Sequence, residues 1–386
     1  MAATRDIKTW LVVFALCMVL TMQLQNLRVC AEPQVPCFFS FGDSLADNGN
    51  NNELATSAKV NYLPYGIDFS DGPTGRFTNG RNTVDILVEL FGFEKGIPSY
   101  ATANGSTSLN GVNYASGTSG IIAASGKHLG DNIHLAKQII NHRITISRIV
   151  EVLGNKMATE RLNKCLYWVA IGNSDYVHNY YFPGTFYPYR RRYDTEEFAD
   201  FVIGNYLRHI KKLYSLGARK IVLVGLGKVG CTPYAISWYE KNNSGTDSGC
   251  VEFMNNAARL FNQKLVALVD ELNVAFKDGK FVYIDAYGTS SGGPTNKIFT
   301  VADVGCCPVN EHGFCIPYRT PCENKDEYIF WDAFNPTTAF NRLVAHSAYR
   351  AYNAASDNDS VDIPRLVHEF GGRTGPTDDM AQRTAS

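Results

Sequence analysis

Polar residues suited to acyl-transfer chemistry follow three of the short apolar runs in this chain, at the point where each run ends. They are Ser44 after the first run, the polar and glycine-rich stretch 113–120 after the second, and Asn173 and Ser174 after the third. A serine hydroxyl flanked by backbone amides and a polar side chain supplies a nucleophile and hydrogen-bond donors for a developing oxyanion. Each signal is weak alone, because Ser44 could cap a helix and glycines serve turns. Together they predict one cleft with a serine nucleophile.

The apolar runs themselves must supply the framework, and they cover residues 35–41, 111–115, 165–171, 220–225 and 281–286. Their mostly unbroken apolar character is typical of strands covered on both faces. Helical patterns alternate with them, most clearly at 83–90, 135–153, 195–216 and 250–277. This alternation predicts a parallel α/β sheet. Ligands bind beyond the carboxyl ends of the strands in such a sheet, so the polar residues are expected to meet there.

Composition limits the classes of function. The chain has 386 residues, of which 45% are hydrophobic, and its 36 basic and 37 acidic residues are well mixed. No electrostatic footprint for nucleic acid or an anionic membrane is visible. No internal repeat or low-complexity linker divides the body of the chain, so a single domain over 32–355 is the simpler interpretation. The polar segment 356–386 has few aromatic residues and is predicted to be flexible.

The first 31 residues have the pattern of a secretory signal peptide. Arg5 and Lys8 precede an apolar stretch at 10–22, and a small residue follows where cleavage would occur. The stretch is too short to span a bilayer. We therefore expect a secreted protein without an integral membrane segment, located in the apoplast or cell wall if the source is a plant. Three sequons, which begin at Asn104, Asn242 and Asn358, fit that route as glycosylation sites.

Removal of the signal leaves eight cysteines, and an even number is typical of disulfides. Cys37 with Cys165 is a plausible pair because both would begin adjacent strands, and Cys231 with Cys250 would close a short loop. The connectivity of the other four is open. His312 lies among them and raises the alternative of zinc. That cluster matches no standard zinc-finger spacing, and thiols of secreted chains usually oxidise, so no metal is expected.

Several motifs resemble the plant GDSL esterase/lipase family of the SGNH-hydrolase superfamily. The matching segments are FGDSLADNGNN at 41–51, PTGRFTNGR at 73–81, GVNYASG at 111–117, GNSDY at 172–176, GARKIVLVGLGKVGCTP at 217–233 and FWDAF-x-PT at 330–337. They fall in the family's order and spacing up to about residue 353. The resemblance implies a three-layer α/β/α sandwich with a five-stranded parallel sheet in the flavodoxin-like order 2-1-3-4-5. It also implies hydrolysis of carboxylic esters, either acyl lipids or small esters, without metal or organic cofactor.

Residue roles follow from the same resemblance. Ser44 corresponds to the nucleophile, and its own amide with that of Gly117 would line the oxyanion hole. Asp332 corresponds to the acid that orients the catalytic base. The family has an asparagine side chain as a third oxyanion donor, whereas this chain has Ser174 in its place. A hydroxyl is shorter and aimed differently, and the neighbouring Asn173 is the alternative donor. Loss of one such donor typically costs about a hundredfold or more in rate.

The second departure from the family concerns the general base. The family places histidine three residues after the aspartate, and here Asn335 stands, which has no group of useful basicity. Loss of the base costs on the order of 10⁴ to 10⁶ in turnover in comparable serine hydrolases. Asn335 ahead of Pro336 also has the pattern of a helix N-cap. His346 would lie about 16 Å further along that helix, out of reach. His178 and His312, both in loops, are weaker alternatives for a base.

Two further patterns allow other interpretations. The segment GLGKVG at 225–230 matches a dinucleotide fingerprint, but the proline at 233 interrupts the expected helix, so a turn at the rim of the cleft is favoured. The stretch 176–193 contains many aromatics and three arginines. It could form an apolar wall for an acyl chain or a stacking surface, or it could be a loop held by its own aromatic side chains.

Two functions from different classes remain on this basis. The first is a secreted esterase or lipase-like enzyme whose catalysis is impaired because Asn335 replaces the base and Ser174 replaces the oxyanion amide. The second is a non-catalytic relative that keeps the pocket and binds a small ligand or a protein partner.

Overall fold

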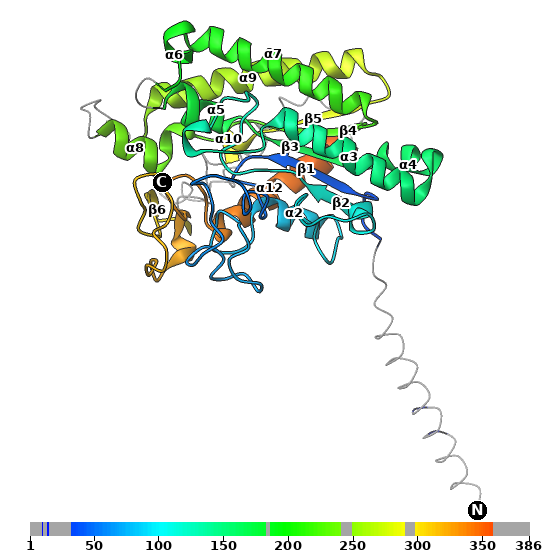
Figure 1. Cartoon of the computed structure of the whole chain (residues 1–386), viewed down its shortest axis with the longest axis horizontal. Coiled ribbons are helices and arrows are strands. Elements are labelled where there is room, and N and C mark those ends of the chain that lie inside the picture. The colour runs from blue at the N-terminus through cyan, green and yellow to red at the C-terminus, as the bar shows by residue number, and fades with distance from the viewer. Residues whose placement is uncertain are drawn as a thin grey trace, which may run out of the picture. The chain divides into compact units, whose positions relative to one another are not determined.

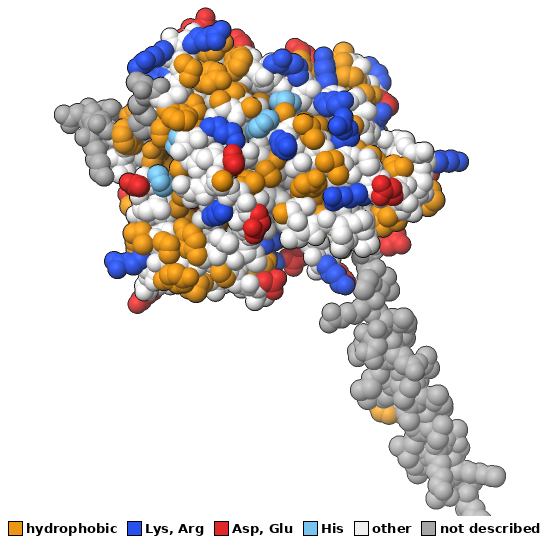
Figure 2. Space-filling view, viewed as in Figure 1, with side chains coloured by type: hydrophobic (Ala, Val, Ile, Leu, Met, Phe, Trp, Pro, Cys, Tyr) orange, Lys and Arg blue, Asp and Glu red, His pale blue; other side chains and the backbone are white. Residues whose placement is uncertain are grey.

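A computed structural model describes Trp10, Phe14 and residues 32–182, 186–240, 249–289 and 298–357. The rest of the predicted signal segment, the sequons at Asn242 and Asn358, and the tail from 358 onward lie outside the described residues. The described part from Val35 onward is one compact unit, and Met1–Gln34 is a separate one. In the unit that begins at Val35, basic and acidic side chains are intermingled on the face seen in Figure 2, in keeping with the mixed charge of the sequence.

The core of that unit is a parallel five-stranded sheet in the order β2-β1-β3-β4-β5 (Figure 1). The strands are β1 Phe38–Gly42, β2 Gly111–Asn113, β3 Leu166–Ala170, β4 Lys220–Val224 and β5 Lys280–Ile284. All five predicted strands and the predicted order are thus confirmed. Every residue of β1 is buried, as expected for a central strand with helices on both faces.

Two helical layers cover the sheet. One face packs against α3 Leu135–Leu153, α7 Thr195–Ser215 and α9 Glu252–Ala275 through a core that includes Phe39 and Tyr167. The other face packs against α2 Thr83–Leu90 and α12 Thr338–Asp357 through a core that includes Phe38 and Trp168. Neighbouring residues of one strand therefore serve opposite layers, as the pleat requires. The three-layer α/β/α architecture is confirmed.

Shorter elements connect these layers. They are α4 Asn155–Leu162, α5 Asn173–Asp175, α6 Tyr189–Arg192, α8 Pro233–Glu240, α10 Ala286–Thr289 and the parallel pair β6 Val301–Gly305 and β7 Tyr328–Phe330. Helical turns of 3₁₀ type lie at Thr107–Asn110, Lys127–Leu129, Val229–Cys231 and Lys325–Glu327, and a π turn lies at Tyr176–Tyr180. The pair β6 and β7 leads directly into the segment that carries Asp332 and Asn335.

Local sequence explains where the main helices begin. Asn82 forms a reciprocal capping box with Asp85 at the start of α2, and Asp194 does the same with Glu197 at the start of α7. The predicted N-cap at Asn335 is wrong, because α12 begins at Thr338 and its amide at Phe340 donates to the Thr337 hydroxyl at 3.3 Å.

The eight described cysteines form four disulfides. The two pairs anticipated from the sequence, Cys37–Cys165 and Cys231–Cys250, are both present. The remaining pairs are Cys306–Cys322 and Cys307–Cys315. The latter two crosslink the loop that packs beneath Trp331, next to Asp332. Since all eight sulfur atoms are used in these bonds, this loop offers no thiolate to a zinc ion.

Candidate active site

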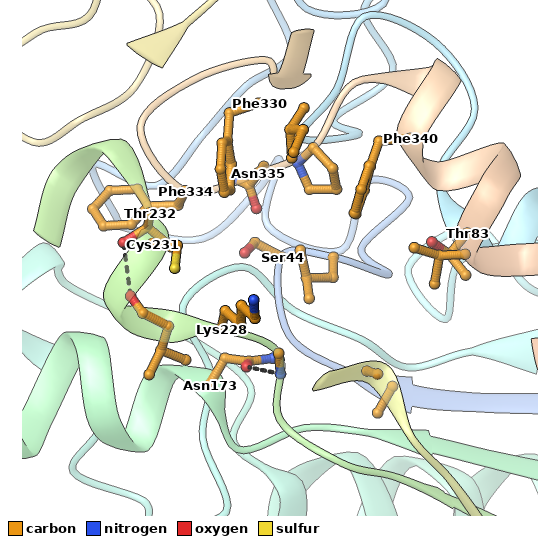
Figure 3. Close-up of a pocket in the computed structure, with 18 of the residues that line it drawn as sticks. Ser44, Thr83, Asn173, Lys228, Cys231, Thr232, Phe330, Phe334, Asn335 and Phe340 are labelled. Atoms are coloured by element: carbon orange, nitrogen blue, oxygen red, sulfur yellow. Dashed lines mark hydrogen bonds between the residues drawn. The ribbon is translucent and has the colours of Figure 1, made fainter. Parts of the chain in front are cut away.

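The carboxyl ends of the strands open onto a pocket of about 420 Å³ (Figure 3). Ser44, Asn173, Ser174 and Asn335 all line it, although they come from widely separated segments. Most of the other lining side chains are apolar, among them Phe330, Phe334, Phe340 and Val344. This size and this mixture of apolar walls with a few polar groups are typical of small-molecule sites.

Ser44 lies in a tight turn immediately after β1. The amide nitrogen of Leu45 donates to the Asp43 carboxylate at 3.1 Å, and that of Asp47 donates to the Asp43 carbonyl at 3.1 Å. No acceptor among the described residues takes the Ser44 amide N–H or its hydroxyl. The hydroxyl is partly exposed at the pocket wall. Both donors are therefore free to meet a ligand, as a nucleophile and an oxyanion donor should be.

The end of β1 is held in place from below. Gln138 of α3 accepts from the Gly42 amide at 3.0 Å and donates to the Gly42 carbonyl at 2.8 Å. A Cβ atom at Gly42 would lie 2.9 Å from the Ala170 carbonyl oxygen, so only glycine fits between the two strands. This close approach sets the position from which the Ser44 turn begins.

Gly117 does not take the role expected of it. Its amide N–H donates to the buried Asp47 carboxylate at 2.8 Å, and Gly117 is not among the described residues that line the pocket. Asp47 also accepts from the amides of Gly49 and Asn50. The Gly117 amide is thus committed to holding the Ser44 loop against the end of β2, and it has no free N–H for an oxyanion.

Asn173 and Ser174 follow β3 in the short helix α5, and both face the pocket. The Asn173 side-chain oxygen accepts from the Gly227 amide at 3.3 Å, which ties α5 to the turn after β4. The Ser174 hydroxyl makes no hydrogen bond to a described residue, although Ser174 is only 4% exposed. Two polar side chains after β3 therefore line the same pocket as Ser44.

Asp332 is fully buried behind Asn335. Its carboxylate accepts from the amides of Phe334 at 2.8 Å and Asn335 at 2.7 Å, and from the Tyr65 hydroxyl at 2.7 Å. Burial raises the pKa of Asp332 to about 6, while these hydrogen bonds favour its charged form. The carboxylate is thus held rigidly, with its remaining acceptor capacity directed at Asn335.

The Asn335 side chain donates to the oxygens of the Asp332 carboxylate. Its amide nitrogen donates to both carboxylate oxygens of Asp332, at 3.1 and 2.9 Å. The opposite orientation of the amide would set three oxygens against one another, so Asp332 dictates which way Asn335 points. The Asn335 side-chain oxygen is then left without a partner among the described residues, and Figure 3 shows it directed toward Ser44. The Asn335 oxygen can therefore accept a hydrogen bond, but a carboxamide cannot retain a proton.

No described imidazole hydrogen-bonds the Ser44 hydroxyl. His346 is exposed on α12, and His312 lies outside the residues that line the pocket. His178 does line the pocket, with its ring 4.7 Å from that of Phe334. Burial lowers the pKa of His178 to about 3, so its imidazole is a weak proton acceptor.

Burial of His178 gives a testable dependence of stability on pH. The folded pKa of about 3 lies below the ordinary value of 6.5, so at pH below 6.5 the unfolded chain binds a proton that the folded chain excludes. Relative to His178→Gln, the wild type should lose about 1.4 kcal/mol of unfolding free energy per pH unit below that value. Urea titrations at several pH values measure this difference. His346→Gln, which changes an exposed ring, is the matched control, and parallel pH profiles for wild type and His178→Gln would contradict the prediction.

Parts of two segments with alternative interpretations, 225–230 and 176–193, line the pocket. The turn after β4 contributes Gly225, Gly227, Lys228 and Val229, followed by a single 3₁₀ turn and α8 rather than a long helix. From the described part of 176–193, only Val177 and His178 reach the pocket. Its other aromatics pack on the protein itself: the Tyr180 ring lies 4.4 Å from that of Phe198, and the Tyr181 ring lies 5.3 Å from that of Phe253.

Sequence reasoning missed three residues that shape the site. Tyr65, which holds Asp332, is 267 residues away along the chain, and nothing in its local pattern marks it. Gln138 is an internal residue of an amphipathic helix. Lys228 belonged to a motif that was interpreted only through its glycines. Of the three, only Gln138 could have been found from the sequence, because a polar residue on the buried face of a helix is unusual.

Comparison with known proteins extends over nearly the whole described chain. The family model for GDSL-like lipase/acylhydrolase matches residues 38–348. The chain is 45% identical to GDSL esterase/lipase At1g29660 of Arabidopsis thaliana over 347 residues, which cover 88% of this chain and 93% of that protein. It is 44% identical to GDSL esterase/lipase At1g29670 of the same plant over 367 residues, which cover 93% and 98%. The range matched by the family model contains Ser44, Asp332 and Asn335.

Proposed function

Because this chain belongs to the GDSL-like lipase/acylhydrolase family, we propose that it binds a carboxylic ester, either an acyl lipid or a small ester, at Ser44. Its hydrolysis of that ester is strongly impaired. The family acts on ester or lipid substrates, and the free Ser44 hydroxyl at the wall of an apolar pocket supports the same substrate class here. The impairment rests on two positions, Asn335 and Ser174, at which this chain departs from the family pattern.

The reaction requires the Ser44 oxygen to attack the ester carbonyl while its proton moves to a base. The Asn335 side-chain oxygen can accept a hydrogen bond from the Ser44 hydroxyl, but a carboxamide does not hold a proton near neutral pH, so the attacking oxygen stays protonated. The oxyanion would meet the Ser44 amide and either the Ser174 hydroxyl or the Asn173 amide group. Fewer well-placed donors lower the rate further.

One observation carries the proposal: the Asn335 amide nitrogen donates to both oxygens of Asp332. The acid that would orient and charge-stabilise an imidazole is occupied by a neutral donor. Removal of the base in comparable serine enzymes leaves only residual catalysis from binding and oxyanion stabilisation.

The direct test compares wild type with Ser44→Ala on p-nitrophenyl esters of short and medium chain length. We expect the two proteins to differ by about tenfold or less in kcat, because a nucleophile without a base contributes little. If Ser44→Ala folds normally and its kcat is about a thousandfold or more below that of wild type, the proposal is wrong, since Ser44 would then be active with an unrecognised base. Circular dichroism of both proteins serves as the folding control.

Ligand binding without turnover is the second candidate function. The intact pocket of about 420 Å³ favours it, because the apolar walls and the free Ser44 donors do not depend on a base. A protein partner that binds over the opening of this pocket is the alternative to a small ligand.

We also propose that the protein is secreted, with a signal peptide over 1–31, one domain over 32–355 and a flexible tail over 356–386. The four disulfides support this route, since such bonds persist in oxidising compartments. Asn104 is exposed and accessible to a glycan, and glycosylation at Asn242 and Asn358 is part of the same proposal. Among the described residues, no helix is both long and apolar enough to cross a bilayer.

A further inference from the structure

Lys228 places a positive charge at the pocket wall without a matching carboxylate. It lies in the turn after β4 and lines the same pocket as Ser44. No carboxylate of the described residues pairs with it, and its ammonium nitrogen lies 5.7 Å from the centroid of the Tyr287 ring. In Figure 3 the ammonium end points into the pocket, between Ser44 and Asn173. A cation beside an apolar cavity without an anionic partner invites an anion from outside the protein.

The two acidic residues that line the pocket do not remove this charge imbalance. Asp43 is 1% exposed and its carboxylate accepts from the Leu45 amide, and burial raises its pKa to about 7, so it carries only part of a charge at neutral pH. Asp303 lines the pocket from β6 but is exposed to solvent, where its charge is screened. Neither forms an ion pair with Lys228.

The interior of the pocket is apolar and lies between the sheet and helix α12. Its walls include Trp168 of β3, Val224 of β4, Ile284 of β5, and Val344 and Ala348 of α12. Trp168, Ile284 and Ala348 also belong to the core between the sheet and helices α2 and α12. The pocket therefore has a charged and polar mouth, where Ser44 and Lys228 lie, and an apolar interior that suits a hydrocarbon chain.

We infer that the pocket retains a single-chain amphiphile with an anionic head group, which Lys228 binds beside Ser44 while the chain occupies the apolar space against α12. This inference rests on the proposed function only in using the same pocket. The head group is a carboxylate or a phosphate, since both accept charge-assisted hydrogen bonds from an ammonium. The free Ser44 donors lie at the wall of the same pocket. A neutral alcohol of equal chain length keeps the apolar contacts and loses the charge pairing.

The test measures binding of decanoate, decyl phosphate and decanol to the full-length protein by isothermal titration calorimetry, below their micelle-forming concentrations. We expect the better of the two anions to bind at least about tenfold more tightly than decanol, the effect of one charge-assisted hydrogen bond. Lys228→Met should abolish this preference while decanol affinity is unchanged, which also shows that the variant is folded. Lys228→Arg should retain the preference. The relative affinities of decanoate and decyl phosphate identify the head group.

Lys211→Met is the matched control. It removes the same charge as Lys228→Met, but from an exposed position on α7. Equal affinity of wild type for the anions and decanol would overturn the inference, as would an anion preference that survives Lys228→Met or disappears equally in Lys211→Met. None of these ligands is a carboxylic ester. Rapid ester hydrolysis by the wild type would therefore contradict only the proposed impairment, and indifference to Lys228 would contradict only this inference.

Discussion

Asn335→His is expected to raise kcat on a p-nitrophenyl ester by about 10²- to 10⁴-fold over wild type, the range that a positioned general base contributes. The geometry around Asp332 supplies the reason. In histidine, Nδ1 is attached to Cγ just as the amide nitrogen is in asparagine, so an Nδ1–H can donate to the same carboxylate oxygens. The remaining ring atoms then extend from the place of the unpartnered Asn335 oxygen, on the side that faces Ser44.

The substitution should also be tolerated by the fold. The asparagine oxygen that it removes is buried without a hydrogen-bond partner, so its loss costs no interaction within the described structure. The added ring atoms enter an existing pocket rather than packed core. Asp332 would hold the imidazole through Nδ1 and stabilise its protonated form during turnover, as the acid does in other serine hydrolases.

Two variants test whether any gain comes from the intended chemistry. Asn335→Gln changes the side-chain length without adding a base and should stay at the wild-type rate. Asn335→His combined with Ser44→Ala should return to background, because the base then has no nucleophile to activate. The kcat of Asn335→His should rise with pH through the imidazole pKa, near 6.5 in an unperturbed ring.

A folded Asn335→His variant without any gain would leave Ser174 as the second defect. Adding Ser174→Asn in that background should then recover about a hundredfold, the typical worth of one oxyanion donor. If the double variant also stays at background, the pocket is not a latent esterase site, and Asn173 does not compensate as a donor either.

The large-scale architecture could be predicted because its signals are local. Unbroken apolar runs marked all five strands, and amphipathic spacing marked α2, α3, α7 and α9, so this alternation alone was enough to predict a parallel α/β sheet. The order 2-1-3-4-5 and the family came instead from the resemblance of the motifs, and both are confirmed. The pairs Cys37–Cys165 and Cys231–Cys250 followed from strand adjacency and loop length.

The details of the site depend on side-chain contacts that the local sequence pattern does not reveal, and there the sequence was a poorer guide. Asn335 has the local pattern of an N-cap, but Asp332 takes its side chain and the cap moves to Thr337. Gly117 looked like an oxyanion donor until Asp47 was seen to accept its N–H. In both cases a buried carboxylate takes the donor, three residues away for Asn335 and 70 residues away for Gly117. An unpaired buried carboxylate is far costlier than a missing cap.

Loss of the Cys37–Cys165 disulfide should be the most destabilising of the disulfide removals. Its cysteines are 128 residues apart, whereas Cys307 and Cys315 are 8 apart. In the chain-entropy model, crosslinks of these lengths stabilise by about 5 and about 2.5 kcal/mol. The first is comparable to the whole net stability of many domains, so Cys37→Ala with Cys165→Ala should unfold at markedly lower urea concentration than wild type.

The comparison with Cys307→Ala/Cys315→Ala isolates the effect of loop length. All four cysteines are buried, so the loss of sulfur packing is similar in the two double variants and largely cancels. No other described disulfide lies within the 37–165 segment, whereas Cys307–Cys315 is nested inside Cys306–Cys322, which already restricts the unfolded loop. Nesting should widen the difference beyond about 2.5 kcal/mol. Equal urea midpoints for the two variants would mean that native-state contacts at these sites, rather than the unfolded chain, determine what each disulfide contributes.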